Sequence, residues 1–162
     1  MSRPKQLPDD VRKMCIQIVC GYQRRRLEYL LRRSELMANT PDNIVTIRDK
    51  EDPDNEDLHE GVYIPSGHNA SRTTENIAEQ ILGLENLLET QRMRAVEYAA
   101  DNVGLDLAEK DRQILINAMF KSCIQGRKYP FERLGVEGME RSCFYERRLK
   151  FLADIAKYMK MI

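Results

Sequence analysis

The sequence predicts an all-α protein in two parts, a long N-terminal helical hairpin (residues 1–104) followed by a C-terminal three-helix module (residues 105–162). Apolar residues recur at three- and four-residue spacing through several long stretches, which is the spacing of one face of a helix. Charged residues make up 32% of the chain and Trp is absent, which favours helices with wide solvated faces over a β-sandwich. Hydrophobic residues make up 42%, so the chain can build a core.

The first helix is expected over residues 9–37. Pro8 followed by Asp9 and Asp10 is a helix start signal, because carboxylates are favourable at the positive end of the helix dipole. Its apolar stripe comprises Val11, Cys15, Ile18, Tyr22, Tyr29 and Leu36. Arginines interrupt this stripe and make the helix basic: Arg24, Arg25, Arg26, Arg32 and Arg33. Two interpretations stay open, a solvated face whose arginine stems cover apolar neighbours and a supplementary contact to a DNA backbone.

Residues 41–72 form an acidic segment that we expect to be a flexible linker. Its acidic residues are Asp42, Asp49, Glu51, Asp52, Asp54, Glu56, Asp57 and Glu60, against only Arg48, Lys50 and Arg72. Such a composition cannot bury much apolar surface. The segment could also mask a basic surface or bind a partner.

A second long helix is expected over residues 73–101. Its apolar stripe comprises Ile77, Ile81, Leu84, Leu88, Ala95 and Tyr98. Two amphipathic helices joined by a linker of about residues 40–72 can pack antiparallel and bury each other's apolar faces. A self-associating coiled coil, and with it a homodimer through the N-terminal helices, is the alternative. Gly104 marks the end of this helix.

The last third of the chain predicts three further helical segments. Asp106 and Glu109 resemble a capping box at the start of the first, whose apolar face comprises Leu107, Ile114, Leu115, Ala118 and Met119. This helix should end at residues 125–126. A short helix is expected over residues 131–134, then a glycine-bearing turn over residues 135–138. The last helix should begin near Met139 or Glu140 and continue to the end of the chain.

This order of a short helix, a turn and a longer basic helix is typical of a helix-turn-helix. The last helix would have an apolar side made of Phe144, Leu149, Phe151, Leu152, Ile155 and Met159. Its polar side would comprise Ser142, Cys143, Glu146, Arg147 and Lys150, a face able to enter a major groove, while Arg148 lies nearer the apolar margin. Residues 107–162 hold 12 basic and seven acidic residues, a local excess of five positive charges in a chain of zero net charge. An ordinary helical bundle with a basic surface is the alternative.

Two motifs in this region, GRKYPFERLG at residues 126–135 and RSCFYERRLKFL at residues 141–152, resemble the C-terminal part of phage transcriptional regulators of the RinA and ArpU type. The closing LADIAKYM at residues 152–159 adds to the likeness, which covers about the last third of the chain. Those regulators end in a module similar to region 4 of bacterial sigma factors. The resemblance implies binding to double-stranded DNA and contact with RNA polymerase. The residues expected to bind DNA are Arg127, Lys128, Arg141, Ser142, Tyr145, Glu146, Arg147, Arg148 and Lys150.

Two departures from the sigma-like pattern bear on these residues. The turn at residues 135–139 is longer and richer in glycine than a tight helix-turn-helix turn, which leaves the crossing angle open. Glu137 and Glu140 place negative charge at the start of the last helix, where a carboxylate facing phosphate weakens binding. A helical interaction or assembly protein, such as a phage packaging adaptor or scaffold, is the alternative function.

The sequence carries no catalytic set, so we expect no enzymatic activity. It has no Gly-rich phosphate loop, no paired-histidine helix and no GxSxG motif. The four cysteines, Cys15, Cys20, Cys123 and Cys143, form no CxxC pair and are expected to be reduced packing residues rather than metal ligands. No apolar run is long enough to cross a membrane. We therefore expect a cytoplasmic protein without metal, cofactor or membrane partner.

Overall fold

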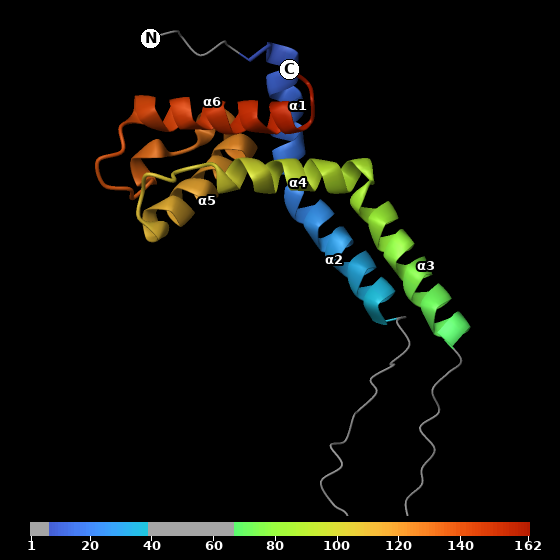
Figure 1. Ribbon diagram of the computed structural model, residues 1–162. Helices are drawn as coiled ribbons and strands as arrows, with labels where there is room; N and C mark the ends of the chain where they lie inside the picture. Colours follow the sequence, from blue (N-terminus) through green and yellow to red (C-terminus); the bar gives the residue numbers. More distant parts are fainter. Residues whose placement is uncertain (1–6, 39–66) are drawn as a thin grey trace, which may run out of the picture. The chain divides into compact units, whose positions relative to one another are not determined.

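The computed structural model describes residues 7–38 and 67–162, and every regular element in these residues is helical. The all-α class is therefore confirmed. The α-helices are α1 (Asp9–Cys20), α2 (Tyr22–Ala38), α3 (Gly67–Glu85), α4 (Leu88–Asp101), α5 (Glu109–Gln125) and α6 (Arg141–Tyr158). Two single turns of 3₁₀ helix, η1 (Gly126–Lys128) and η2 (Phe131–Arg133), lie between α5 and α6 (Figure 1). Most of the expected acidic linker, residues 41–66, lies outside the described residues.

The described chain forms two compact units. The first contains residues up to Tyr29 together with Asn86–Ile162, and the second contains Leu30–Glu85. In the first unit α6 packs along α4 and against α1, and α1 also contacts α4 and α5 (Figure 1). Helices from both sides of residue 104 therefore share one core, which differs from the expected division into residues 1–104 and 105–162.

The physical reason for this difference is the width of the apolar face of α6. Its fully buried residues are Phe144, Phe151, Leu152, Ile155 and Ala156. At about 100° per residue these side chains cover an arc too wide for the preceding helix alone to bury. Met93 and Val96 of α4 and Cys15 and Val19 of α1 complete the core against them. None of the helices in the part of the chain described is long and apolar enough to span a membrane.

The helix expected over residues 9–37 is interrupted at Gly21, and Arg25 accounts for the interruption. Arg25 is buried, and its Nη1 donates a hydrogen bond to the Ile18 carbonyl at 2.7 Å. Its Nε donates to the carboxylate of Glu89 on α4. A Cβ on Gly21 would lie 2.6–2.8 Å from the Arg25 guanidinium atoms, so only glycine leaves room for it. Arg25 is therefore neither on a solvated face nor available to DNA.

The helix expected over residues 73–101 is also interrupted, between α3 and α4 at Asn86 and Leu87. The interruption changes the helical phase. Leu84 and Ala95 are buried as expected, but Leu88 and Tyr98 are exposed. The arrangement of two uninterrupted helices as a hairpin is therefore not confirmed. The expected stop near Gly104 is observed, since α4 ends at Asp101 and Gly104 has φ +65°. An added Cβ at Gly104 would lie 3.3–3.4 Å from neighbouring side-chain atoms, so a larger residue would have to displace them.

Candidate nucleic-acid interface on α6

The connection from α5 to α6 fixes the N-terminal end of α6 through aromatic packing. The ring of Phe144, which is fully buried, stacks on Tyr129 and contacts Phe131, both with centroids 5.5 Å away. Gly135 and Gly138, with φ near +72°, form the turn that leads back to α6. The short helix expected over residues 131–134 is the single 3₁₀ turn η2. A helix-turn-helix joins two helices by a short turn, whereas residues 126–140 separate α5 from α6, so this arrangement is not confirmed.

One face of α6 is exposed along most of its length. Its exposed residues at helical spacing are Ser142, Glu146, Leu149, Lys150 and Lys157, which we call the α6 face. The sequence placed Leu149 on the apolar side, but 39% of this residue is exposed. Leu149 lies at the margin of the apolar arc, where the neighbouring helices no longer cover it. Lys157 was not among the expected site residues. It follows Lys150 by seven residues, which is two helical turns, and this spacing could have placed it on the same face as Lys150.

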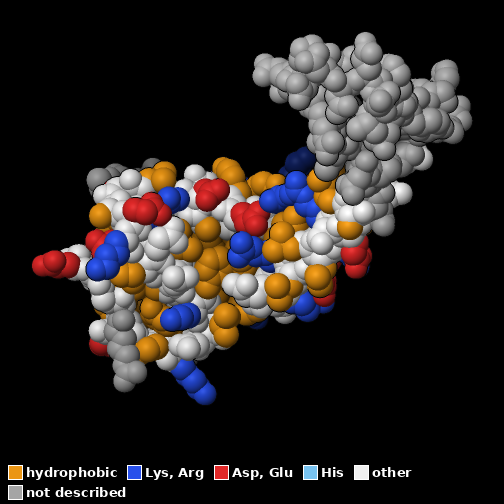
Figure 2. All heavy atoms as spheres, turned by 90° about the horizontal axis from the view of Figure 1, so that it is seen from below, with side chains coloured by type: hydrophobic (Ala, Val, Ile, Leu, Met, Phe, Trp, Pro, Cys, Tyr) orange, Lys and Arg blue, Asp and Glu red, His pale blue; other side chains and the backbone are white. Residues whose placement is uncertain are grey.

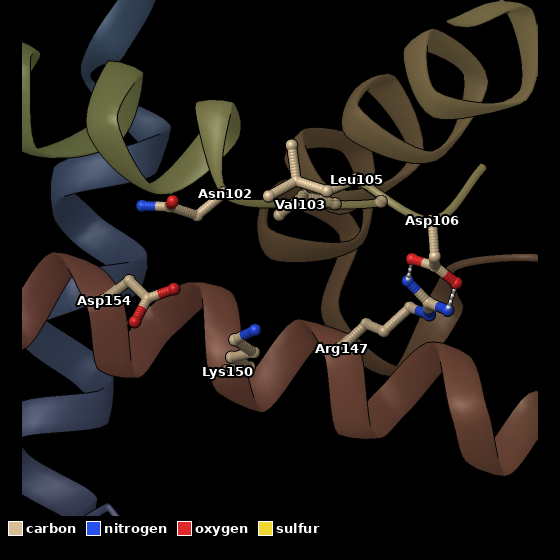
Figure 3. A pocket seen from close by; sticks show the side chains of 8 residues that line it. Asn102, Val103, Leu105, Asp106, Arg147, Lys150 and Asp154 are labelled. Atoms are coloured by element: carbon tan, nitrogen blue, oxygen red, sulfur yellow. Dashed lines mark hydrogen bonds and ion pairs between the residues drawn. The ribbon is translucent and has the colours of Figure 1, made fainter. Parts of the chain in front are cut away.

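Arg147 was expected on the open polar side, but the structure pairs it with Asp106. Its Nη1 and Nη2 donate to the two carboxylate oxygens of Asp106 at 2.8 and 2.6 Å (Figure 3). Its Nε also lies 3.4 Å from the Cys143 Sγ. The hydrogen bonds from Arg147 lower the pKa of Asp106 to about 2, so the carboxylate is ionised at neutral pH. Asp106 therefore ties the loop before α5 to α6.

This pairing corrects the expected capping role of Asp106. The residue at the N-cap of α5 is Ala108, and no side chain makes the cap hydrogen bond. Helix α5 begins at Glu109 as the pattern indicated, but the carboxylate expected to cap it binds an arginine on another helix.

Arg148 is partly buried and held by α5. Its Nε donates to the Ser122 Oγ at 3.1 Å, and the Ser122 hydroxyl donates to the Met119 carbonyl at 2.9 Å. Burial raises the pKa of the neighbouring Cys123 thiol, and the charge of Arg148 partly opposes that rise. Arg148 is thus a packing residue that joins α6 to α5.

A shallow hollow of about 170 Å³ lies between the α4–α5 loop and α6 (Figure 3). It is lined by Asn102, Val103, Gly104, Leu105, Asp106, Arg147, Lys150 and Asp154. Its two cationic side chains face two carboxylates. The charges therefore balance, and the hollow is not built to collect anions.

The other candidate residues lie mostly at the N-terminal end of α6. Arg141 is exposed, with its guanidinium 5.9 Å from the centroid of the partly buried Tyr145 ring and 3.8 Å from the Glu132 carboxylate. Lys128 in η1 is exposed. The side chain of Arg127 lies outside the described residues. The face drawn in Figure 2 carries Lys and Arg beside Asp and Glu, with hydrophobic side chains between them, so no single sign of charge covers that face.

The chain matches no family model, no curated protein and no solved structure.

Proposed function

We propose that this protein is a sequence-specific DNA-binding transcriptional regulator that presents the α6 face to the major groove. The observation that carries the proposal is an exposed polar face on an 18-residue helix whose opposite side is fully buried. Such a helix is about 27 Å long and is rigidly held, as a groove-reading helix must be. The resemblance of residues 126–159 to RinA- and ArpU-type regulators supports the same function and is the ground for including RNA polymerase as a partner.

The exposed chemistry of α6 suits base and phosphate contacts. Lys150 can donate to guanine, Glu146 can accept from the cytosine amino group, and Leu149 can contact a thymine methyl group. Arg141 and Lys157 stand near the two ends of the helix, where phosphates flank the groove. On the exposed side these two lysines and one arginine stand against Glu146 and against Glu140 at the start of the helix.

Arg147 and Arg148 take a different role in this proposal from the one expected. Both guanidinium groups already bind protein groups, Asp106 and Ser122. They act as positioning residues that set how α6 lies on α5 and on the loop before it. Their removal should weaken DNA binding only through the orientation of α6.

The test is selection of duplex DNA from a random-sequence pool at near-physiological salt. Wild type is compared with Lys150→Ala/Lys157→Ala and with a control, Lys13→Ala/Lys110→Ala, which removes two exposed lysines outside α6. We expect wild type and control to enrich the same sequence motif and the α6 variant to lose it. Each lost phosphate contact should also reduce the slope of log K against log salt by about 0.9. Enrichment of no motif by the folded wild type would refute the proposal.

A second function, a helical interaction or assembly protein, is favoured by the exposed leucines of α2. Leu27, Leu30 and Leu31 are each about half exposed or more. An interaction through apolar side chains would persist at high salt, whereas DNA binding through lysines weakens steeply. Salt dependence of the bound fraction therefore separates the two functions.

A further inference from the structure

Two cysteines far apart in the sequence lie beside each other where α1 packs against α5. The Sγ of Cys20, the last residue of α1, is 4.0 Å from the carbonyl oxygen of Cys123, which lies in the last turn of α5. Close by, the rings of Tyr22 and Phe120 stack with their centroids 5.3 Å apart. Tyr22 follows Cys20 by two residues, and Phe120 precedes Cys123 by about one turn. This stacking therefore keeps the ends of α1 and α5 together.

The two thiols differ in their access to solvent. Cys20 is exposed, whereas only 4% of Cys123 is exposed. Burial raises the pKa of the Cys123 thiol, the positive charge of Arg148 opposes that rise, and a negative charge on Cys20 adds to it. The influence of one thiol on the pKa of the other shows that the side chains, and not only the backbones, are near each other. A reagent in solution therefore meets Cys20 first, with Cys123 as the thiol beside it.

Both cysteines lie where the backbone can adjust. A disulfide needs two Cα atoms about 4.4–6.8 Å apart and a sulfur–sulfur bond of about 2 Å, so the two thiols must turn toward each other. The ends of helices fray more readily than their middles. A glycine directly follows each helix, Gly21 after α1 and Gly126 after α5, and glycine adopts backbone conformations that other residues rarely reach. The two helix ends can therefore shift to form the bond while the rest of each helix stays in place.

Cys15 is the competing partner for both thiols. It is fully buried, and burial together with the nearby Cys123 raises its pKa to about 11. Oxidation therefore does not start at Cys15. Cys15 and Cys20 are five residues apart on one helix, so their side chains point about 140° apart around its axis. A bond between them would require α1 to unwind, which leaves Cys123 as the partner of Cys20.

We propose that Cys20 and Cys123 are a redox-responsive pair, which closes a disulfide between α1 and α5 in the presence of a small-molecule disulfide. The thiolate of Cys20 attacks one sulfur of that molecule, its S–S bond breaks, and the released thiolate takes the proton that Cys20 lost. Cys123 then loses its proton and attacks the Cys20 Sγ, and the second thiol leaves with that proton. Two protein thiols are oxidised, and one small-molecule disulfide is reduced to two thiols. The proposal does not rest on DNA binding, since neither cysteine belongs to the α6 face.

The first experiment identifies the bond. The full chain is oxidised with glutathione disulfide under native conditions, the remaining thiols are blocked with iodoacetamide in urea, and linked peptides are found by mass spectrometry. We expect one intramolecular link, between Cys20 and Cys123, with Cys15 and Cys143 unlinked. Cys20→Ser should abolish the link, whereas Cys143→Ser, the matched control at the partly exposed cysteine of α6, should keep it. Absence of this link, with or without glutathione attached to Cys20, would overturn the proposal, and so would a link from Cys20 to another cysteine.

The second experiment shows whether the link suits the folded chain. Urea unfolding followed by circular dichroism compares reduced and oxidised protein. The two cysteines are 103 residues apart, so a bond between them restricts the unfolded chain. We expect a higher urea midpoint after oxidation, a return to the reduced value when a thiol reductant is added, and no change in Cys20→Ser. An oxidised wild type with an equal or lower midpoint, or with less helical signal, would show that the bond disrupts the packing of α1 on α5 and would refute the proposal.

Discussion

Replacing Arg25 by Met should destabilise the first compact unit far more than replacing an arginine on an exposed helix face. The substitution keeps the aliphatic stem but removes the guanidinium that binds the Ile18 carbonyl and the Glu89 carboxylate. A hydrogen bond from a charged group is worth about 1.5–3 kcal/mol. The pair with Glu89 adds less than about 1 kcal/mol, because the Glu89 side chain is 47% exposed and solvent screens it. We therefore expect the free energy of unfolding to fall by about 2–4 kcal/mol.

The assay is urea unfolding followed by helical circular dichroism at one protein concentration. Arg12→Met is the matched control: Arg12 pairs with Asp9 at 2.8 Å on the surface of α1, and its loss should cost under about 0.5 kcal/mol. If Arg25→Met and Arg12→Met have the same effect, the structural role assigned to Arg25 is wrong.

Gly21 gives a sharper form of the same test. A methyl group at residue 21 meets the Arg25 guanidinium at 2.6–2.8 Å, so Gly21→Ala should cost about 1–3 kcal/mol in the wild type. In the Arg25→Met background the obstruction is gone and the backbone has an ordinary φ of −87°. There Gly21→Ala should be neutral or slightly stabilising. Additive effects of the two substitutions would refute the proposed contact.

Three further predictions concern the core, the ion pair and the thiols. Phe144→Ala should cost about 3–5 kcal/mol in urea unfolding, because the ring is fully buried between aromatic neighbours; a cost under 1 kcal/mol would contradict that packing. The Asp106 carboxyl should titrate near pH 2 by NMR and move towards its usual pKa in Arg147→Gln; since the folded pKa is lowered, its stabilising contribution is present above about pH 4 and is lost as pH falls towards 2. Iodoacetamide should modify the exposed Cys20 well before Cys15, whose burial raises its pKa to about 11; equal rates would argue against the described burial.

Helical periodicity predicted most of the local structure. The ends of α4 and α5 follow from Gly104 and Gly126, because both glycines adopt positive φ. The buried residues of α6 were also largely predicted, since Phe144, Phe151 and others recur on one side of the helix. These successes share a cause: they depend on neighbours within one or two turns of the same helix.

The errors concern contacts between residues far apart in the sequence. Nothing within a few residues of Asp106 indicates that it binds Arg147 rather than capping α5. Arg25 interrupts an apolar stripe in the sequence, and only the position of Glu89 on α4 explains how it is buried there. The sequence therefore predicted the helix that carries most of the candidate residues, but it assigned the wrong surroundings to Arg147 and Arg148.

The packing of α1 against α5 and α6 has a consequence for how the chain folds as it is synthesised. Roughly 140 residues separate the end of α1 from the end of α6, and a ribosome needs about 7–28 s to add them. During that interval Ile18 and Val19 have no core to enter, although both are buried in the finished unit. The nascent chain therefore carries an uncovered apolar helix until its last helix is made. Shielding of this helix by a chaperone during synthesis is therefore the expected behaviour of this protein.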